Sequence, residues 1–233
     1  MGRPRRVALG GWVYHVLNRA NARLALFERP DDYAAFERIL AQGIERFRPR
    51  LLAYCLMPNH WHLLLWPEQD DVLSQFVGWV TLTHTQRLHV HRGTVGGGHI
   101  YQGRFKSFPV QEDEHFYAVA RYVERNALRA GLVSRAEEWR WSSLADRSER
   151  RTGPSAEASE PPLRDLLSKW PVSRPSDWRR LVNRGQTTAE LAALRRSLSR
   201  GIPYGGPRWT KQAAAELELD TTLRPRGRPR KGA

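Results

Sequence analysis

The chain has 233 residues, enough for one domain of ordinary size with a smaller attached part. Its 38 Lys and Arg residues exceed its 24 Asp and Glu residues, and the formal net charge of +14 makes nucleic acid the first candidate partner. No apolar run approaches the ~18 residues of a membrane-spanning helix, and no apolar signal core follows the N-terminal Arg residues, so we expect a cytoplasmic protein without a membrane partner. The lone Cys55 excludes an intrachain disulfide and lies in an apolar run typical of a buried residue.

The pattern of apolar residues predicts an alternation of strands and helices over the first 130 residues. Asp31 or Asp32 is available to cap the first helix, and Pro58-Asn59-His60 is a turn signal that predicts a hairpin between two strands. In chain order the predicted elements are strand 11–18, helix 33–47, strands 51–57 and 61–66, helix 72–90, strand 104–110 and helix 112–130.

This order is that of a split βαβ fold. We therefore expect an α+β, ferredoxin-like domain with a four-stranded antiparallel sheet and helices on one face, followed by a small C-terminal helical appendage. Thr187 and Glu190 fit a capping box in one of three short helices expected over 176–183, 187–198 and 208–219. The predicted parts are a domain over 1–146, a linker over 147–162, a helical DNA-binding appendage over 163–223 and a disordered basic tail over 224–233.

His60 and His62 are the first candidate functional residues, as a pair of metal ligands. Residues two apart on a strand face the same side, so both imidazoles can reach one metal ion while Trp61 and Leu63 turn into the core. A bare His-x-His pair on a strand is more often a surface or hydrogen-bonded pair than a metal site, so a further partner is required.

The helix over 112–130 can supply that partner. Tyr122 and Asn126 lie four residues apart, so on a continuous helix they share one flank, whereas Tyr117 falls on the opposite flank. The alternative is that Tyr122 is an ordinary half-buried aromatic residue and Asn126 a surface polar one. A tyrosine near a divalent ion in a basic protein can instead attack a phosphodiester and keep the bond energy in a phosphotyrosine.

Three segments carry a resemblance to a known family. Residues 56–64 read Leu-Met-Pro-Asn-His-Trp-His-Leu-Leu, residues 122–133 read Tyr-Val-Glu-Arg-Asn-Ala-Leu-Arg-Ala-Gly-Leu-Val, and residues 141–143 read Trp-Ser-Ser. Together they closely resemble the REP-associated tyrosine transposases, which are IS200-like, single-tyrosine members of the His-hydrophobic-His endonuclease superfamily. The resemblance covers about residues 10–145, and the Arg-Gly-Arg-Pro-Arg-Lys ending also recurs in the family. Ala127 departs from the Pro that often follows the Asn.

The resemblance implies a function for these residues. Tyr122 would be the nucleophile, and His60, His62 and Asn126 would hold a divalent metal, Mg²⁺ or Mn²⁺. The domain over 1–146 would nick and rejoin single-stranded DNA folded as a palindromic hairpin, through a 5′-phosphotyrosine intermediate. The family also implies a bacterial protein associated with the nucleoid. Neither the oligomeric state, monomer or homodimer, nor the use of Tyr122 within its own chain follows from the sequence.

Basic residues near the predicted site suit DNA binding. Arg104 and Lys106, beside Tyr101 and Phe105, could grip a backbone and stack bases, although surface charge at a helix–strand junction is an equally ordinary explanation. The tail resembles a minor-groove hook, and the alternative is a solvated basic segment that raises DNA affinity without recognising the base sequence. The tail residues assigned to DNA binding are Arg224, Arg226, Arg228, Arg230 and Lys231.

Two other classes of protein fit part of the sequence. A DNA-binding regulator that keeps the fold without cleaving DNA would use His60 and His62 structurally. A metal-dependent oxygenase or hydrolase would add an acid such as Glu68 to the two histidines, but no acidic ligand is spaced to pair naturally with the strand, and +14 suits a small anionic substrate poorly.

Overall fold

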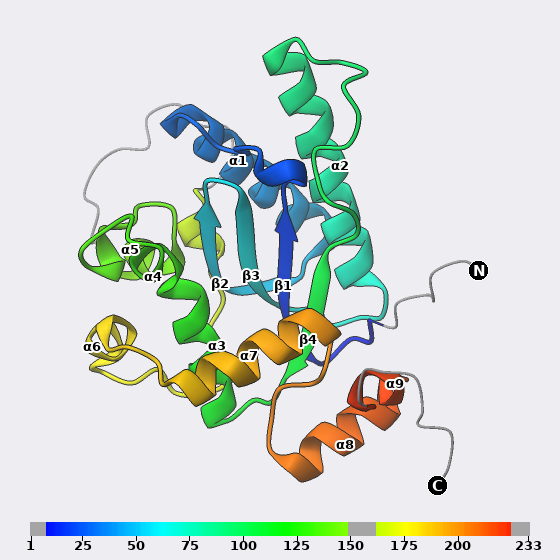
Figure 1. Cartoon of the computed structure of the whole chain (residues 1–233), viewed down its shortest axis with the longest axis vertical. Helices are drawn as coiled ribbons and strands as arrows, with labels where there is room; N and C mark the ends of the chain where they lie inside the picture. Colours follow the sequence, from blue (N-terminus) through cyan, green and yellow to red (C-terminus); the bar gives the residue numbers. More distant parts are fainter. Residues whose placement is uncertain (1–7, 149–161, 225–233) are drawn as a thin grey trace, which may run out of the picture.

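A computed structural model describes residues 8–148 and 162–224. Its centre is an antiparallel sheet of four strands in the order β2-β3-β1-β4 (Figure 1). This is the strand order of a split βαβ fold, so the predicted α+β fold class is confirmed. The strands are β1 (Val13–Arg19), β2 (Arg50–Met57), β3 (His60–Trp66) and β4 (Lys106–Val110).

Two long helices cover one face of the sheet. They are α1 (Pro30–Phe47) and α2 (Val72–Arg92), and their buried side chains pack on Tyr14, Val16 and Trp61. Gly43 allows the two helices to approach closely, because a Cβ there would lie 2.8 Å from the ring of Phe76.

The other face is also covered by helices, so the expectation of helices on one face only is wrong. Phe116 and Val119 of α3 (Glu114–Glu124) pack on Ala53 and Cys55 of β2, and Trp178 belongs to the same buried cluster. The physical reason lies in the strands themselves. From Leu51 to Met57 every residue of β2 is buried, and a strand that is apolar on both sides needs a cover on both sides.

The C-terminal part supplies much of this second cover. Leu194 of α7 (Thr188–Arg200) lies in the cluster with Trp178, and Figure 1 shows α7 crossing in front of β4. Thr187 and Glu190 form the predicted capping box at the start of α7. The other helices of this part are α6 (Trp178–Asn183), α8 (Pro207–Glu216) and α9 (Asp220–Leu223). Residues 149–161, most of the predicted linker, lie outside the described residues.

Two predicted details differ in the structure. Arg29, not Asp31 or Asp32, is the N-cap residue of α1; Asp32 caps from inside the first turn, accepting the N–H groups of Glu28 and Arg29. The helix expected over 112–130 is two helices, α3 and α4 (Asn126–Arg129). The short elements that periodicity did not reveal are η1 (Asn21–Arg23), η2 (Ala136–Glu138), α5 (Ser143–Ser148) and η3 (Leu163–Leu166).

The break between α3 and α4 is fixed by polar contacts with neighbouring elements. The buried carboxylate of Glu124 accepts hydrogen bonds from Ser143 Oγ and Trp178 Nε1, both at 2.6 Å. The next residue, Arg125, donates to the carbonyl oxygens of Val182 and Asn183 at the end of α6. These bonds hold the C-terminal part against α3. Among the described helices, none is both long and apolar enough to cross a membrane.

Candidate metal and nucleophile site

His60 and His62 share the face of β3 that meets α3, while Trp61 and Leu63 pack under α1 and α2 as predicted. Both histidines are buried, and their ring centroids are 5.1 Å apart. The Nδ1 atom of His60 lies 2.7 Å from Asn59 Oδ1, and the Nδ1 atom of His62 lies 2.8 Å from the Nε2 atom of His15. The Nδ1 atom of each ring is therefore held by a neighbouring side chain.

The surroundings keep both imidazoles neutral. The pKa of His60 is lowered to about 3, mainly by burial and less by the charges of Arg19 and Arg129, while a hydrogen bond with Asn126 opposes the shift. Burial, followed by the rings of His15 and His60, holds the pKa of His62 well below its usual range. A metal ion binds the neutral form of imidazole, so the pair is in the right protonation state for ligation at neutral pH.

His15 is a site residue that sequence reasoning missed. It is fully buried on β1, its ring packs at a tilt against Phe108, and its Nε2 atom lies 2.8 Å from Nδ1 of His62. Burial lowers the pKa of His15 to about 3, so it too is neutral. A histidine bound to metal through Nε2 commonly donates its Nδ1–H to a partner that fixes the ring. His15 and Asn59 are placed to do this for His62 and His60.

Tyr122 faces the histidines from α3. Its ring centroid lies 5.6 Å from that of His62 and 6.1 Å from that of His15, in edge-to-face orientation. Tyr117 points to the other side of the helix, where its hydroxyl donates to the carbonyl oxygen of Ser173 at 2.5 Å and its ring packs on Trp170. The structure thus places the two tyrosines on opposite flanks of α3, and only Tyr122 meets the histidine pair.

Asn126 lies at the same site, but on a different helix from Tyr122, whereas the spacing indicated a single helix. It lies beyond the helix break as the first residue of α4, so the argument from a continuous helix is wrong here. Its side chain is nevertheless 3% exposed and hydrogen-bonds with His60. Its amide Nδ2 is buried with no hydrogen-bond partner among the described residues.

Arg129 is a second site residue that the sequence did not single out. Its guanidinium carbon lies 4.1 Å above the centre of the Tyr122 ring, a cation–π contact. Its Nη1 atom is buried and has no hydrogen-bond partner within the described part of the chain. Its charge lowers the pKa of both His60 and His62, so the guanidinium lies near the pair as well as over the tyrosine.

The donor set fits a divalent ion by its chemistry. Two neutral imidazoles and the buried side-chain amide of Asn126 lie together, and imidazole nitrogens and an amide oxygen are ligands that such an ion accepts. Glu68 is not part of this set, because it follows Trp66, the end of β3 opposite to His60, and that strand alone is about 20 Å long at strand rise. Asp113, Glu114 and His115 also bring ligand atoms within 4.8 Å of one another, but Asp113 already caps α3 and bonds His115.

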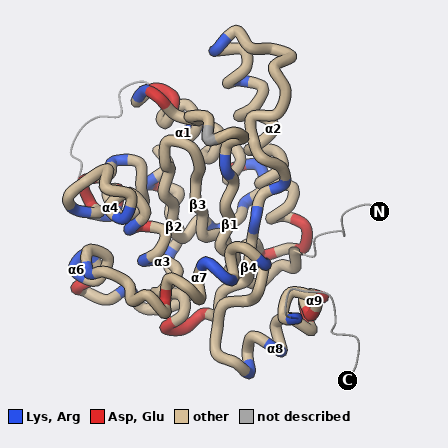
Figure 2. Tube along the Cα trace, viewed as in Figure 1, with Lys and Arg blue, Asp and Glu red and all other residues tan. Residues whose placement is uncertain are grey.

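Only some of the basic residues assigned to DNA binding lie in the described part of the chain. Arg104 and Lys106 are exposed and line a cavity of about 360 Å³ together with Arg19, whose Cα is paired with that of His60 across β1 and β3. In Figure 2, Lys and Arg segments lie beside β1 and β4 and along α7. The backbone carbonyl of Arg224 accepts a hydrogen bond from Arg200. The remaining tail residues, Arg226, Arg228, Arg230 and Lys231, lie outside the described residues.

The amino-acid sequence of this domain, whose sheet carries the histidine pair facing Tyr122, matches a known protein family. Residues 10–126, half of the chain, match the model of the IS200-like transposases, and the chain belongs to this family. One relative, a Haemophilus influenzae protein assigned as a REP-associated tyrosine transposase, is 25% identical over 117 residues. That match covers 47% of this chain and 66% of the relative, slightly under two thirds of its length.

A solved structure shows the same fold. It is a REP-associated tyrosine transposase bound to a REP hairpin, with 21% sequence identity and a TM-score of 0.53, and the match covers 68% of this chain and 92% of that one. The resemblance inferred from the sequence motifs is therefore confirmed.

Proposed function

We propose that the protein is a metal-dependent endonuclease and strand transferase acting on single-stranded hairpin DNA through a 5′-phosphotyrosine intermediate. The observation that carries this proposal is the meeting of Tyr122 with His60 and His62 between α3 and the sheet. Family membership and the hairpin bound to the solved relative support it. A divalent ion held by His60, His62 and Asn126 would polarise the scissile phosphate and neutralise its developing charge.

The reaction is a transfer of one phosphodiester bond. The phenolic oxygen of Tyr122 attacks the phosphorus and its proton leaves to solvent, while the bond to the 3′-oxygen breaks and that oxygen takes up a proton. The products are a 5′-phosphotyrosine and a free 3′-hydroxyl. A second 3′-hydroxyl can attack the phosphotyrosine and restore the tyrosine, which joins new ends without ATP.

The chain's own residues orient these steps. His15 and Asn59 hold the two imidazoles by their Nδ1 atoms. Arg129 stacks on the Tyr122 ring and offers its unpaired Nη1–H to a phosphate oxygen. Arg19, Arg104 and Lys106 lie at the edge of the site, where they attract the strand. The basic tail from Arg224 onward adds contacts to the duplex part of the hairpin.

The test is adduct formation. The full chain is incubated with labelled single strands that carry hairpins, with Mg²⁺ or Mn²⁺, and run on a denaturing gel. We expect a covalent protein–DNA band that disappears with Tyr122→Phe and with chelation of the metal, and that persists with the matched control Tyr117→Phe. Hairpin binding without any adduct would instead identify a non-cleaving regulator. An adduct that survives Tyr122→Phe would assign the nucleophile to another residue.

A further inference from the structure

The segment over 173–186 in the C-terminal part is bonded to α3 along most of that helix. The bonded pairs are, in order along α3, Tyr117 with Ser173, Ala118 with Gln186, Arg121 with Arg184 and Gly185, Glu124 with Trp178, and Arg125 with Val182 and Asn183. Among these pairs, only Glu124 and Trp178 join two buried side chains. Their bond lies at the end of α3, between Tyr122 and Asn126.

Glu124 is a buried carboxylate without a cationic partner. The residue is fully buried, and its carboxylate forms no ion pair within the described part of the chain. Burial raises the pKa of this carboxyl, and the hydrogen bonds of Ser143 and Trp178, followed by the charges of Arg174 and Arg147, oppose the shift. A buried carboxylate that lacks a paired cation costs free energy of folding. The stability of the fold therefore does not explain why the chain has a glutamate at this position.

The two oxygens of Glu124 connect three elements. Oε1 accepts the hydroxyl of Ser143, the first residue of α5, and Oε2 accepts the indole N–H of Trp178, the first residue of α6, both at 2.6 Å. Ser143 Oγ in turn accepts the backbone N–H of Tyr54 on β2 at 3.0 Å. Because β2 pairs with β3, the strand of the histidine pair, a short chain of hydrogen bonds runs from the sheet through Ser143 to the end of α3.

The sequence neighbours of Glu124 are residues of the proposed site. Tyr122 lies two positions before it and Asn126 two positions after it, and both are buried beside the histidine pair. A displacement of about 1 Å at a reacting group can slow a reaction about 100-fold. The contacts that fix the junction of α3 and α4 therefore also fix how far Tyr122 and Asn126 lie from His60 and His62.

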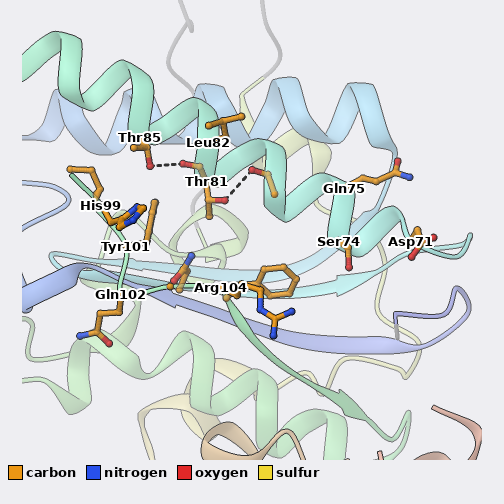
Figure 3. A pocket seen from close by; sticks show the side chains of 15 residues that line it. Asp71, Ser74, Gln75, Thr81, Leu82, Thr85, His99, Tyr101, Gln102 and Arg104 are labelled. Carbon is orange, nitrogen blue, oxygen red and sulfur yellow. Dashed lines mark hydrogen bonds between the residues drawn. The ribbon is translucent and has the colours of Figure 1, made fainter. Parts of the chain in front are cut away.

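The junction is separate from a cavity on the other face of the sheet. That cavity has a volume of about 920 Å³ and lies between α2 and the segment 99–105 (Figure 3). None of its described lining residues belongs to α3, α4, α5 or α6. Substitutions at Glu124, Ser143 or Trp178 therefore remove none of its walls.

We propose that Glu124 is a positioning residue that holds the α3–α4 junction at a fixed distance from the histidine pair. Its carboxylate accepts one hydrogen bond from Ser143, which is bonded to the sheet, and one from Trp178, which belongs to the C-terminal part. The inference rests on the proposed function and adds a role for the C-terminal part, which keeps Tyr122 beside the histidines. Loss of the Trp178 bond then slows attack by Tyr122 without weakening DNA binding.

Three variants and a matched control test this role. Trp178→Phe keeps a ring in the buried cluster but removes the donor to Glu124, and Glu124→Leu removes the acceptor. Glu124→Gln keeps both bonds, because its amide oxygen can accept from Trp178 while its amide N–H donates to Ser143 Oγ. The control is Trp170→Phe. Trp170 packs against Trp178 with ring centroids 4.9 Å apart, but its indole N–H donates to the carbonyl oxygen of Leu52 on β2 and not to the junction.

The rate of adduct formation is measured with the full chain at saturating hairpin DNA and Mn²⁺. We expect Trp178→Phe and Glu124→Leu to react about 100-fold more slowly than Trp170→Phe does, whereas Glu124→Gln should regain most of the rate. The dissociation constant of the hairpin should be equal in all of these variants. Equal rates in Trp178→Phe and Trp170→Phe, or a rate of Glu124→Gln as low as that of Glu124→Leu, would overturn the proposal.

The double variant Glu124→Leu/Trp178→Phe separates positioning from general stability. Removing both partners of a buried hydrogen bond is often nearly neutral, whereas removing one leaves the other unpaired. We therefore expect its thermal midpoint to lie closer to that of the unaltered chain than the midpoint of Trp178→Phe does, while its rate of adduct formation stays low. If the rate recovers together with the midpoint, Glu124 has a structural role only and the proposal is wrong.

Hydrogen exchange of the full chain alone gives a readout that needs no reaction. We expect faster exchange of the backbone amides of residues 122–130 in Trp178→Phe than in Trp170→Phe. If the unaltered chain forms the Tyr122 adduct and the two Trp variants react equally fast, the positioning role is wrong and the proposed function stands. If the unaltered chain forms no adduct, the proposed function is wrong, and equal exchange in the two Trp variants would then also overturn the assignment of Glu124 as the residue that fixes the junction.

Discussion

The contact between His15 and His62 gives a sharp prediction about metal binding. His15→Phe preserves a ring beside Phe108 but removes the atom that holds His62 Nδ1 at 2.8 Å. Loss of a residue that orients a metal ligand typically weakens metal affinity by about 10- to 100-fold, or about 1.4–2.7 kcal/mol. We expect this loss for Mn²⁺ binding to the full chain, measured by isothermal titration calorimetry.

The free energy of unfolding should fall by less than the full cost of one unpaired buried group. The substitution leaves His62 Nδ1 without a partner, which costs about 1–3 kcal/mol. It also removes the Nδ1 atom of His15, which is itself buried with no partner among the described residues, and this offsets part of the cost. A metal effect without a large shift of the unfolding midpoint would distinguish orientation of His62 from general destabilisation.

His84→Phe is the matched control. His84 is also a buried histidine that bonds one neighbour, the hydroxyl of Tyr101 at 2.6 Å, but it lies under α1 and α2 on the other face of the sheet. We expect this variant to bind Mn²⁺ as the unaltered chain does. Unchanged affinity in His15→Phe, or an equal loss in His84→Phe, would refute the idea that His15 orients a ligand.

Three further outcomes follow from the structure. Arg129→Gln should slow adduct formation about 100-fold at saturating DNA, with Arg129→Lys intermediate and DNA affinity little changed; an unchanged rate would remove Arg129 from the reaction. Acid should unfold the chain, because burial lowers the pKa of His15, His60 and His84 to about 3 while the unfolded chain takes up protons near pH 6.5. The free energy of unfolding that these neutral histidines contribute is complete above pH 6.5 and is lost as the pH falls toward 3. At pH 5 the loss for the three together is about 6 kcal/mol, so an unfolding midpoint that stays constant from pH 7 to 4 would contradict this prediction. Deletion of residues 224–231 removes five positive charges and should weaken DNA binding and flatten its salt dependence by up to about 4.5 logarithmic units per decade of salt, the value for contacts with duplex DNA, whereas an unchanged slope would show that the tail does not contact phosphate.

The local pattern of apolar residues was sufficient to predict the four strands and the common face of His60 and His62. Apolar runs and turn signals located all four strands, and strand periodicity placed His60 and His62 on one face. These features depend on residues close in sequence. The helical cover on the second face did not follow from them, because strands buried on both sides do not reveal which segment covers them.

The positions of the residues around His60 and His62 depend on contacts between segments far apart in the sequence. His15 meets His62 only because β1 pairs with β3 in a particular register, and that register is set by the whole sheet. Arg129 lies over Tyr122 from α4, and the junction of α3 and α4 at Arg125 is bonded to partners more than fifty residues away in α6. Neither contact leaves a periodic signal, so the sequence indicated Tyr122, His60 and His62 as candidates but not the residues that surround them.

The most direct test of the account is the chemical identity of the covalent bond. The full chain is reacted with a hairpin strand and Mn²⁺, the DNA is digested with nuclease, and the tryptic peptides are sequenced by mass spectrometry. We expect a nucleotide joined through its 5′-phosphate to Tyr122 and to no other residue. A nucleotide on Tyr117, or a bond through a 3′-phosphate, would contradict the assignment of Tyr122 as the attacking group.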